Sequence, residues 1–229
     1  VYRAEYEKLT AVIEKFFWDE EKGAYIDSFT SGRRNVTRHA NIFAILFSIA
    51  DETKQEKILK NVLENDEIPA ITTPYFNFFE LDVLCRMGKL TEVLDKIRSY
   101  WGGMLDLGAV TFWEEYDPSV PKEEQYDMYG DHFGKSLCHA WAASPIYFLA
   151  KYFAGLDLVN KDGVTYILKP QMQYFTELDC TLPVGSNGVV RLVWDGEILE
   201  ITPNADGGIL ELGEQKLSLV RGETRRVKI

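Results

Sequence analysis

The chain has 229 residues, of which 46% are hydrophobic and 13% aromatic, enough to bury one large core or two modest ones. Its 36 acidic residues outnumber 25 Lys and Arg, and the net charge of -11 argues against nucleic acid or an anionic membrane as partner. A neutral or cationic ligand fits this charge better. No apolar run reaches the ~18 residues that span a bilayer.

The chain starts at Val1 rather than Met. We therefore expect it to be a piece of a longer or processed protein, and the sequence leaves the cellular compartment open.

Helices are predicted along the first two-thirds of the chain, and they alternate between two kinds. One kind has a single apolar stripe and a charged face, as in a surface helix; the other is apolar nearly all round and must be covered on every side. The first kind is predicted at 2–17, 54–64 and 90–104, and the second at 40–50, 75–87 and 138–153. This alternation favours part of a toroid of helical hairpins, with inner helices shielded by outer ones. A compact helical bundle is the alternative.

After Gly155 the sequence changes to short β-rich runs separated by Gly, Pro, Asn and Asp. Residues 189–194 and 197–202 flank Asp195-Gly196, which is a strong hairpin signal because glycine accepts the positive φ of a tight turn. Further strands are predicted at 209–212, 216–220 and 225–229. The spacing indicates a small antiparallel β-sandwich. We therefore expect a helical domain at 1–155 and a β-sandwich at 156–229.

The cysteines are Cys85, Cys138 and Cys180, an odd number without the short paired spacing of a zinc site. They are interpreted as buried free thiols. The sequence indicates neither a metal nor a cofactor.

In a toroid, the segments before the inner helices meet at one end, so their polar side chains converge. These segments are 33–41, 72–77 and 108–137, and all are rich in hydrogen-bonding and aromatic groups. The third is unusually long, and loops of that length are more often functional than idle. In it, Trp113 and Tyr116 flank Glu114 and Glu115, a combination that suits sugar binding and hydrolysis. The alternative is a solvated acidic loop with Trp113 in the core.

Several motifs resemble one family in the same order along the chain. They are Phe-Trp-Asp-Glu-Glu-Lys-Gly-Ala-Tyr from Phe17, His-Ala-Asn from His39, Thr-Pro-Tyr-Phe from Thr73, Gly-Ala-Val-Thr-Phe-Trp-Glu-Glu from Gly108, and Ser-Leu-Cys-His-Ala-Trp-Ala-Ala-Ser-Pro from Ser136. Together they resemble the C-terminal part of the bacterial α-L-rhamnosidases. The resemblance implies the second half of an (α/α)6 toroid followed by a C-terminal β-sandwich. It also implies an inverting glycoside hydrolase that releases terminal L-rhamnose.

The family's general base is the glutamate directly after the Trp of the Thr-Phe-Trp-Glu motif, and the resemblance therefore implies Glu114 here. Glu115 is the alternative, and because neighbours in an extended loop point to opposite sides, only one of them can face the sugar.

The resemblance also implies substrate-binding residues. Trp113 is expected to form a wall of the sugar site, with a core anchor as the alternative. His139 matches a histidine that hydrogen-bonds rhamnose hydroxyls, although a structural histidine on an apolar helix is the competing interpretation. Trp141, Tyr75 and His39 complete the expected set; His39, like its neighbour Arg38, has a structural alternative.

Inversion needs a second carboxyl group, an acid ~6.5–9.5 Å from the base. In the family this acid belongs to the earlier half of the toroid, and none of Asp127, Asp131 and Glu80 stands in a matching motif. We therefore expect the chain to carry the base but lack the acid, to be inactive alone, and to need the missing N-terminal half as partner. Two alternatives remain open: a non-catalytic carbohydrate-binding module, and another toroid enzyme such as an epimerase or polysaccharide lyase that uses His139 and a tyrosine.

Overall fold

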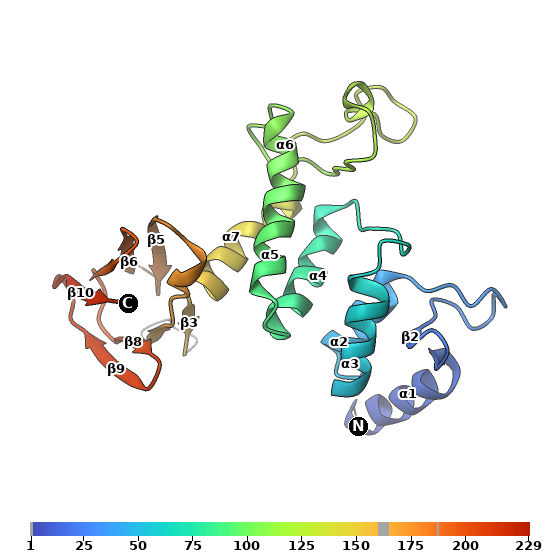
Figure 1. Ribbon diagram of the computed structural model, residues 1–229, viewed down its shortest axis with the longest axis horizontal. Coiled ribbons are helices and arrows are strands. Elements are labelled where there is room, and N and C mark those ends of the chain that lie inside the picture. The colour runs from blue at the N-terminus through green and yellow to red at the C-terminus, as the bar shows by residue number, and fades with distance from the viewer. Residues whose placement is uncertain (1, 160–164, 187) are drawn as a thin grey trace. The chain divides into compact units, whose positions relative to one another are not determined.

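The computed structural model describes residues 2–159, 165–186 and 188–229. It divides into two compact units, Val1–Ala143 and Ser144–Ile229, and Figure 1 follows the chain through both. The third predicted inner helix groups with the sheets in this division. The domain limit predicted near Gly155 stays a prediction.

The first unit is helical except for one small hairpin. Its elements are α1 (Tyr2–Phe17), β1 (Trp18–Asp19), β2 (Ala24–Tyr25), α2 (Arg38–Leu46), α3 (Glu52–Ile58), the π-helical η1 (Leu59–Leu63), α4 (Pro74–Arg86), α5 (Leu90–Lys96), the π-helical η2 (Ile97–Trp101), α6 (Gly102–Asp106) and the short 3₁₀ turns η3 (Lys122–Glu124) and η4 (Ala140–Ala142). Helix α5, η2 and α6 form one rod beside α4 (Figure 1). The helices predicted up to residue 104 are therefore present, in the predicted order.

Local sequence explains where these helices start. Asp51 caps α3, because its carboxylate accepts the backbone N–H of Lys54 at 2.9 Å. Helix α4 opens on Pro74, whose fixed φ suits the first helical position and whose missing N–H is not needed there. Both helices thus begin within two residues of the predicted positions.

A buried ion group joins α2, α4 and α5. The guanidinium of Arg38 donates to Glu80 Oε1 at 2.9 Å and to the carbonyl of Leu63 at 2.9 Å. Lys96 Nζ lies 2.5 Å from the same carboxylate oxygen. Burial lowers the pKa of Lys96, while the charge of Glu80 acts in the opposite direction. Removing one partner of such a group leaves a buried charge unpaired, so Glu80 has a structural task.

Helix α1 differs from the expected surface helix because none of its residues is buried. Its apolar positions Tyr2 and Leu9 are exposed, and Tyr6 donates through its hydroxyl to the carbonyls of Phe47 and Ser48 at 2.8 and 3.0 Å. The N-terminal part of the apolar stripe on α1 is therefore uncovered, while Phe16 near its end packs on Phe29 with ring centroids 5.0 Å apart.

The predicted helix at 138–153 starts six residues late, at α7 (Ser144–Phe148), and continues as the π-helical η5 (Leu149–Phe153). Pro145 explains the shift, because proline lacks the N–H that a helix interior requires and is tolerated in the first turn, where α7 has it. Cys138 consequently lies outside the helix and is exposed, so its expected burial is wrong. Each helix in the described ranges is too short or too polar to span a bilayer.

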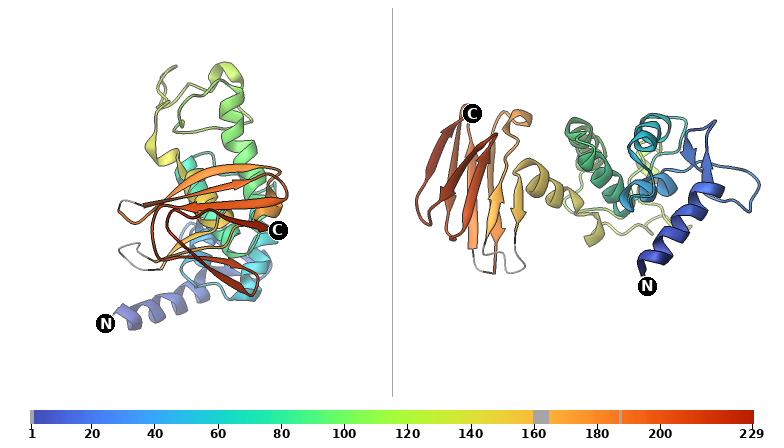
Figure 2. Two further views of the ribbon diagram at one scale, coloured as in Figure 1. Left: turned by 90° about the vertical axis from the view of Figure 1, so that its left-hand side faces the viewer. Right: turned by 90° about the horizontal axis from the view of Figure 1, so that it is seen from below.

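The second unit adds two four-stranded sheets, which lie face to face in Figure 2. The strands are β3 (Leu156–Leu158), β4 (Tyr166–Leu168), β5 (Leu178–Val184), β6 (Gly188–Trp194), β7 (Ile198–Pro203), β8 (Gly208–Leu212), β9 (Gln215–Leu219) and β10 (Arg225–Lys228), with a 3₁₀ turn η6 (Met172–Tyr174). The sheet orders are β10-β7-β6-β5 and β3-β4-β8-β9. Neighbouring strands are antiparallel as predicted, with one exception. After β7 the chain crosses to the other sheet, where β8 pairs parallel with β4.

The hairpin predicted at Asp195-Gly196 joins β6 and β7. Gly196 takes a φ of +96°, and the Asp195 carboxylate accepts the N–H groups of Glu197 and Ile198 at 2.9 and 2.7 Å. Alternate residues of both strands, including Leu192, Trp194, Leu199 and Ile201, are buried between the sheets. The alternation and the turn together fix the register of this pair.

Candidate active site

Two distant motifs of the long loop lie side by side. The backbone N–H of Glu114 donates to the carbonyl of Ser136 at 2.9 Å, and the N–H of His139 donates to the carbonyl of Phe112 at 2.8 Å. A third tie joins the loop to the segment before α4, because the N–H of Tyr116 donates to the carbonyl of Thr72 at 3.1 Å. The fold therefore brings together residues 112–116, residues 136–139 and Thr72.

The carboxylate of Glu114 is half-buried and held through both oxygens. Oε2 accepts the backbone N–H of Ser136 at 3.1 Å, and Oε1 accepts the hydroxyl of Tyr129 at 3.1 Å. A carboxylate has about four lone-pair sites, so these two bonds leave acceptor capacity for a further donor such as water.

Glu115 is directed to a different partner. Its Oε1 accepts the hydroxyl of Thr72 at 2.8 Å, just before α4. A hollow of about 570 Å³ is lined there by Thr72, Tyr100, Tyr116 and others. The two adjacent glutamates thus serve different neighbours, as expected for successive residues of an extended segment.

A buried cation balances this acidic loop. Lys135 is 8% exposed, and burial lowers its pKa, while the carboxylates of Glu115, Asp117 and Asp127 act in the opposite direction. This lysine is not among the residues predicted from the sequence. The available signal was its isolation, because it is the only Lys or Arg between Lys122 and Lys151.

Trp113 is only 3% exposed, and its ring packs against Tyr126 with centroids 5.6 Å apart. This placement matches the core anchor better than the expected wall of a sugar site, because the ring has almost no accessible face. The large apolar ring holds the segment before Glu114 in the protein interior.

The other predicted binding residues form a continuous aromatic row. His139 contacts Trp141, Trp141 contacts Tyr75, Tyr75 contacts Phe76, and Phe76 contacts His39, with centroid distances of 5.5, 5.5, 5.9 and 4.2 Å. Trp141 and Tyr75 are 69% and 49% exposed. The structure therefore gathers four of the five predicted residues at the starts of α2, α4 and η4, and adds Phe76, which the sequence analysis did not name as a site residue.

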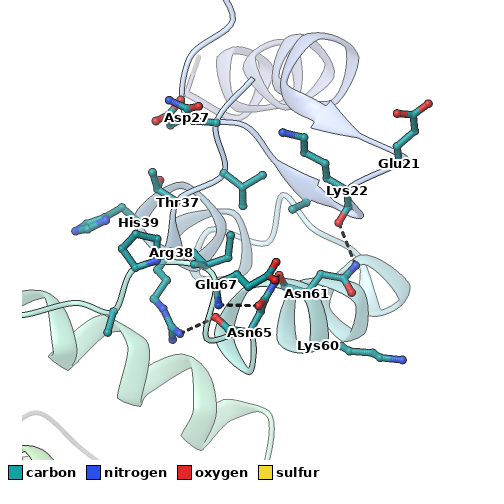
Figure 3. A pocket seen from close by; sticks show the side chains of 16 residues that line it. Glu21, Lys22, Asp27, Thr37, Arg38, His39, Lys60, Asn61, Asn65 and Glu67 are labelled. Atoms are coloured by element: carbon teal, nitrogen blue, oxygen red, sulfur yellow. Dashed lines mark hydrogen bonds between the residues drawn. The ribbon is translucent and has the colours of Figure 1, made fainter. Parts of the chain in front are cut away.

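The far end of this row borders a polar hollow of about 830 Å³ (Figure 3). His39 and Arg38 at the start of α2 line it together with Asn61 and Asn65, and in Figure 3 the Arg38 side chain extends toward Asn65. The amide of Asn61 donates to the carbonyl of Lys22 at 3.1 Å, and Arg38 donates to the carbonyl of Asn65 at 3.4 Å. The amides and charges suit a polar ligand, whereas Glu114 lines no part of this hollow.

Comparison with known proteins places these features in one family. The family model of the bacterial alpha-L-rhamnosidase 6 hairpin glycosidase domain matches residues 1–153. The comparison with curated proteins gives no match.

Three solved structures are similar over most of the chain. A GH78 family rhamnosidase of Bacillus sp. GL1 is 24% identical with a TM-score of 0.72, covering 90% of this chain and 22% of its own. A rhamnosidase from Klebsiella oxytoca with rhamnose bound is 31% identical with a TM-score of 0.59, covering 66% and 28%. An alpha-L-rhamnosidase from Dictyoglumus thermophilum is 20% identical with a TM-score of 0.64, covering 93% and 24%.

The chain thus spans about a quarter of the length of these proteins. Its helices and sheets fit the predicted class of a partial helical toroid followed by a β-sandwich. By the family model that covers two-thirds of its length, the chain belongs to the bacterial α-L-rhamnosidase family of six-hairpin glycosidases.

Proposed function

We propose that the chain is part of a glycoside hydrolase that releases terminal L-rhamnose from α-L-rhamnosides with inversion. Membership of the family supports the reaction class, and the Klebsiella oxytoca relative with rhamnose bound supports the sugar. The acidic net charge of the chain is compatible with a neutral glycoside as substrate.

Glu114 is the proposed general base, and one observation carries this assignment. Its half-buried carboxylate is held by Ser136 and Tyr129 beside the segment of His139 and retains free lone pairs. A general base that takes a proton from the attacking water needs a carboxylate that is held in place and can accept a further hydrogen bond. Glu115 has one oxygen occupied by the hydroxyl of Thr72 and is proposed to fix the loop on α4.

The general acid is proposed to come from the part of the toroid that these residues do not include. Inverting enzymes place the acid ~6.5–9.5 Å from the base. Glu80 is committed to Arg38 and Lys96, and Asp127 is engaged with His132 Nδ1 at 2.6 Å. Because the acid is proposed to lie outside these residues, the chain alone is expected to be inactive.

The test uses an enzyme with the complete toroid and an aryl α-L-rhamnoside. Glu114→Gln should lower turnover ~10²–10⁴-fold, the usual loss when a general base is removed. Glu115→Gln is the matched control, because it neutralises the adjacent carboxylate, and it should lower turnover far less. A reversed order would assign the base to Glu115, and full activity of both variants would refute the assignment of the base to this loop. Absence of hydrolysis by the unaltered enzyme would refute the proposed function. Proton NMR of the first product should show the anomer opposite to the substrate.

A second candidate function is carbohydrate binding by this chain without catalysis. The exposed rings of Trp141 and Tyr75 favour it, because aromatic faces pack against the C–H surface of a sugar. Calorimetric titration of the chain with L-rhamnose would show affinity that Trp141→Ala removes. Affinity in the chain, combined with normal turnover of the Glu114→Gln enzyme, would favour a binding role for this chain over a catalytic one.

A further inference from the structure

The hydroxyl that reaches Glu114 comes from the tip of a tight turn. Met128 and Asp131 exchange both backbone hydrogen bonds, at 3.0 and 2.9 Å, which leaves Tyr129 and Gly130 as the two turn residues. Their φ angles are +55° and +85°. Turns with two positive φ angles prefer Asn-Gly or Asp-Gly, whereas a bulky residue with positive φ is an outlier. Tyr129 therefore occupies a strained position that Asn would fill more easily.

Burial does not offset this strain. Tyr129 is 83% exposed, so its ring gains little from packing. Its one hydrogen bond in the described part of the chain runs from the hydroxyl to Glu114 Oε1 at 3.1 Å. The nearby carboxylate also raises the pKa of the Tyr129 phenol, so the hydroxyl keeps its proton and remains a donor. Strain kept without packing in return is typical of a functional position.

A row of rings, in which Phe133 is exposed and Trp113 buried, links the turn to the interior beside Glu114. His132 Nδ1 contacts Asp127 Oδ1 at 2.6 Å and thereby links the two sides of the turn. The ring of His132 lies 4.5 Å from Phe133, Phe133 lies 6.2 Å from Tyr126, and Tyr126 lies 5.6 Å from the buried Trp113. This chain of rings leads back to the residue directly before Glu114, so the turn and the carboxylate share one support.

We propose that Tyr129 is a positioning residue for the carboxylate of Glu114. Its hydroxyl fixes Oε1 while the backbone N–H of Ser136 fixes Oε2, and together they set the direction in which the free lone pairs accept a proton from the attacking water. The inference rests on the proposed function, and it adds a residue whose task is orientation of the base. A misplaced catalytic group loses rate through geometry even when it stays in the right protonation state.

The experiment uses two substitutions in an enzyme with the complete toroid. Tyr129→Asn relieves the backbone strain and removes the phenol, and Tyr129→Phe removes only the hydroxyl. Both should lower kcat about 10–100-fold with little change in KM, because orientation of the base is lost. Thermal unfolding should show an unchanged Tm for Tyr129→Phe and an equal or higher Tm for Tyr129→Asn. Tyr2→Phe, which removes another exposed hydroxyl outside the site, should match the wild type.

Loss of rate without loss of stability would support the positioning role, because a merely structural residue would lower Tm as well. Unchanged kcat in both variants would overturn the inference, and so would a parallel fall of kcat and Tm in Tyr129→Phe. The Glu114→Gln enzyme separates the two proposals. If that variant is inactive while Tyr129→Phe is normal, only the positioning role fails; if Glu114→Gln is fully active, the proposed base itself fails.

Discussion

Gly103 lies against the side chain that follows the two glutamates. A Cβ built at this position would meet Tyr116 Oη, Cζ and Cε1 at 2.4, 2.5 and 2.6 Å. Ordinary contacts lie near 3.5 Å, so in Gly103→Ala the ring would have to retreat by about 1 Å. Tyr116 resists this movement because its N–H is bonded to Thr72 and its ring packs on Tyr100 with centroids 5.6 Å apart.

Two opposing effects determine how Gly103→Ala changes the free energy of unfolding. Overpacking of this kind destabilises by about 1–3 kcal/mol. Replacing glycine by alanine inside a helix stabilises by about 0.5–1 kcal/mol. Gly103→Ala should therefore lower the free energy of unfolding by up to about 2.5 kcal/mol, with about 1 kcal/mol as the central value, and disturb the segment of Glu114 and Glu115.

Gly102→Ala is a matched control one residue earlier, because an added Cβ there meets nothing within 4 Å. It should raise the free energy of unfolding by about 0.5–1 kcal/mol. Urea denaturation followed by far-ultraviolet circular dichroism compares both variants, and Gly103→Ala in a Tyr116→Ala background should lose its penalty. A Gly103→Ala chain as stable as Gly102→Ala would refute the claim that Tyr116 reserves this position for glycine.

Two further predictions concern charges. Glu80→Ala leaves Arg38 buried without its counter-charge and should reduce the free energy of unfolding by about 3–5 kcal/mol in urea denaturation; a loss below about 1 kcal/mol would contradict this account. Burial raises the pKa of Asp19, but hydrogen bonds from the Lys22 N–H and Arg34 outweigh it and hold the pKa below its usual value. Because the folded pKa is lowered, this stabilisation is present above about pH 4 and is lost as pH falls through the folded pKa. The stability difference between the wild type and Asp19→Asn should accordingly shrink in acid, and a constant difference would contradict it.

The sequence predicted the elements whose signals are local. Apolar periodicity located the helices up to residue 104, and Asp195-Gly196 located the β6–β7 hairpin, because both patterns act within a few residues. The late start of α7 could also have been predicted, since proline prefers the first turn of a helix and Pro145 lies there. The parallel pairing of β4 with β8 was not, because it joins strands separated by some forty residues.

The candidate site was predictable only in part, because some of its contacts join residues that are distant in the sequence. Converging segments before the inner helices explained why His39, Tyr75 and Trp141 lie in one row. The direction of Trp113 depends on Tyr126, and the role of Tyr129 depends on a turn whose sequence departs from the preferred one. Neither the contact of Trp113 with Tyr126 nor that of Tyr129 with Glu114 can be identified from residue spacing, since a long loop has no period that orients its side chains.

The backbone bonds at Glu114 and His139 close the long loop at its base, so residues 115–135 start and end at nearly the same point. Such a closed segment tolerates exchange, because its two ends keep their separation whatever chain lies between them. An exchanged segment that keeps Tyr116, Tyr126 and Lys135, which pack against the helical unit or lie buried, should therefore leave the fold intact. Donor sequences should keep a residue that can reach the carboxylate from the tip.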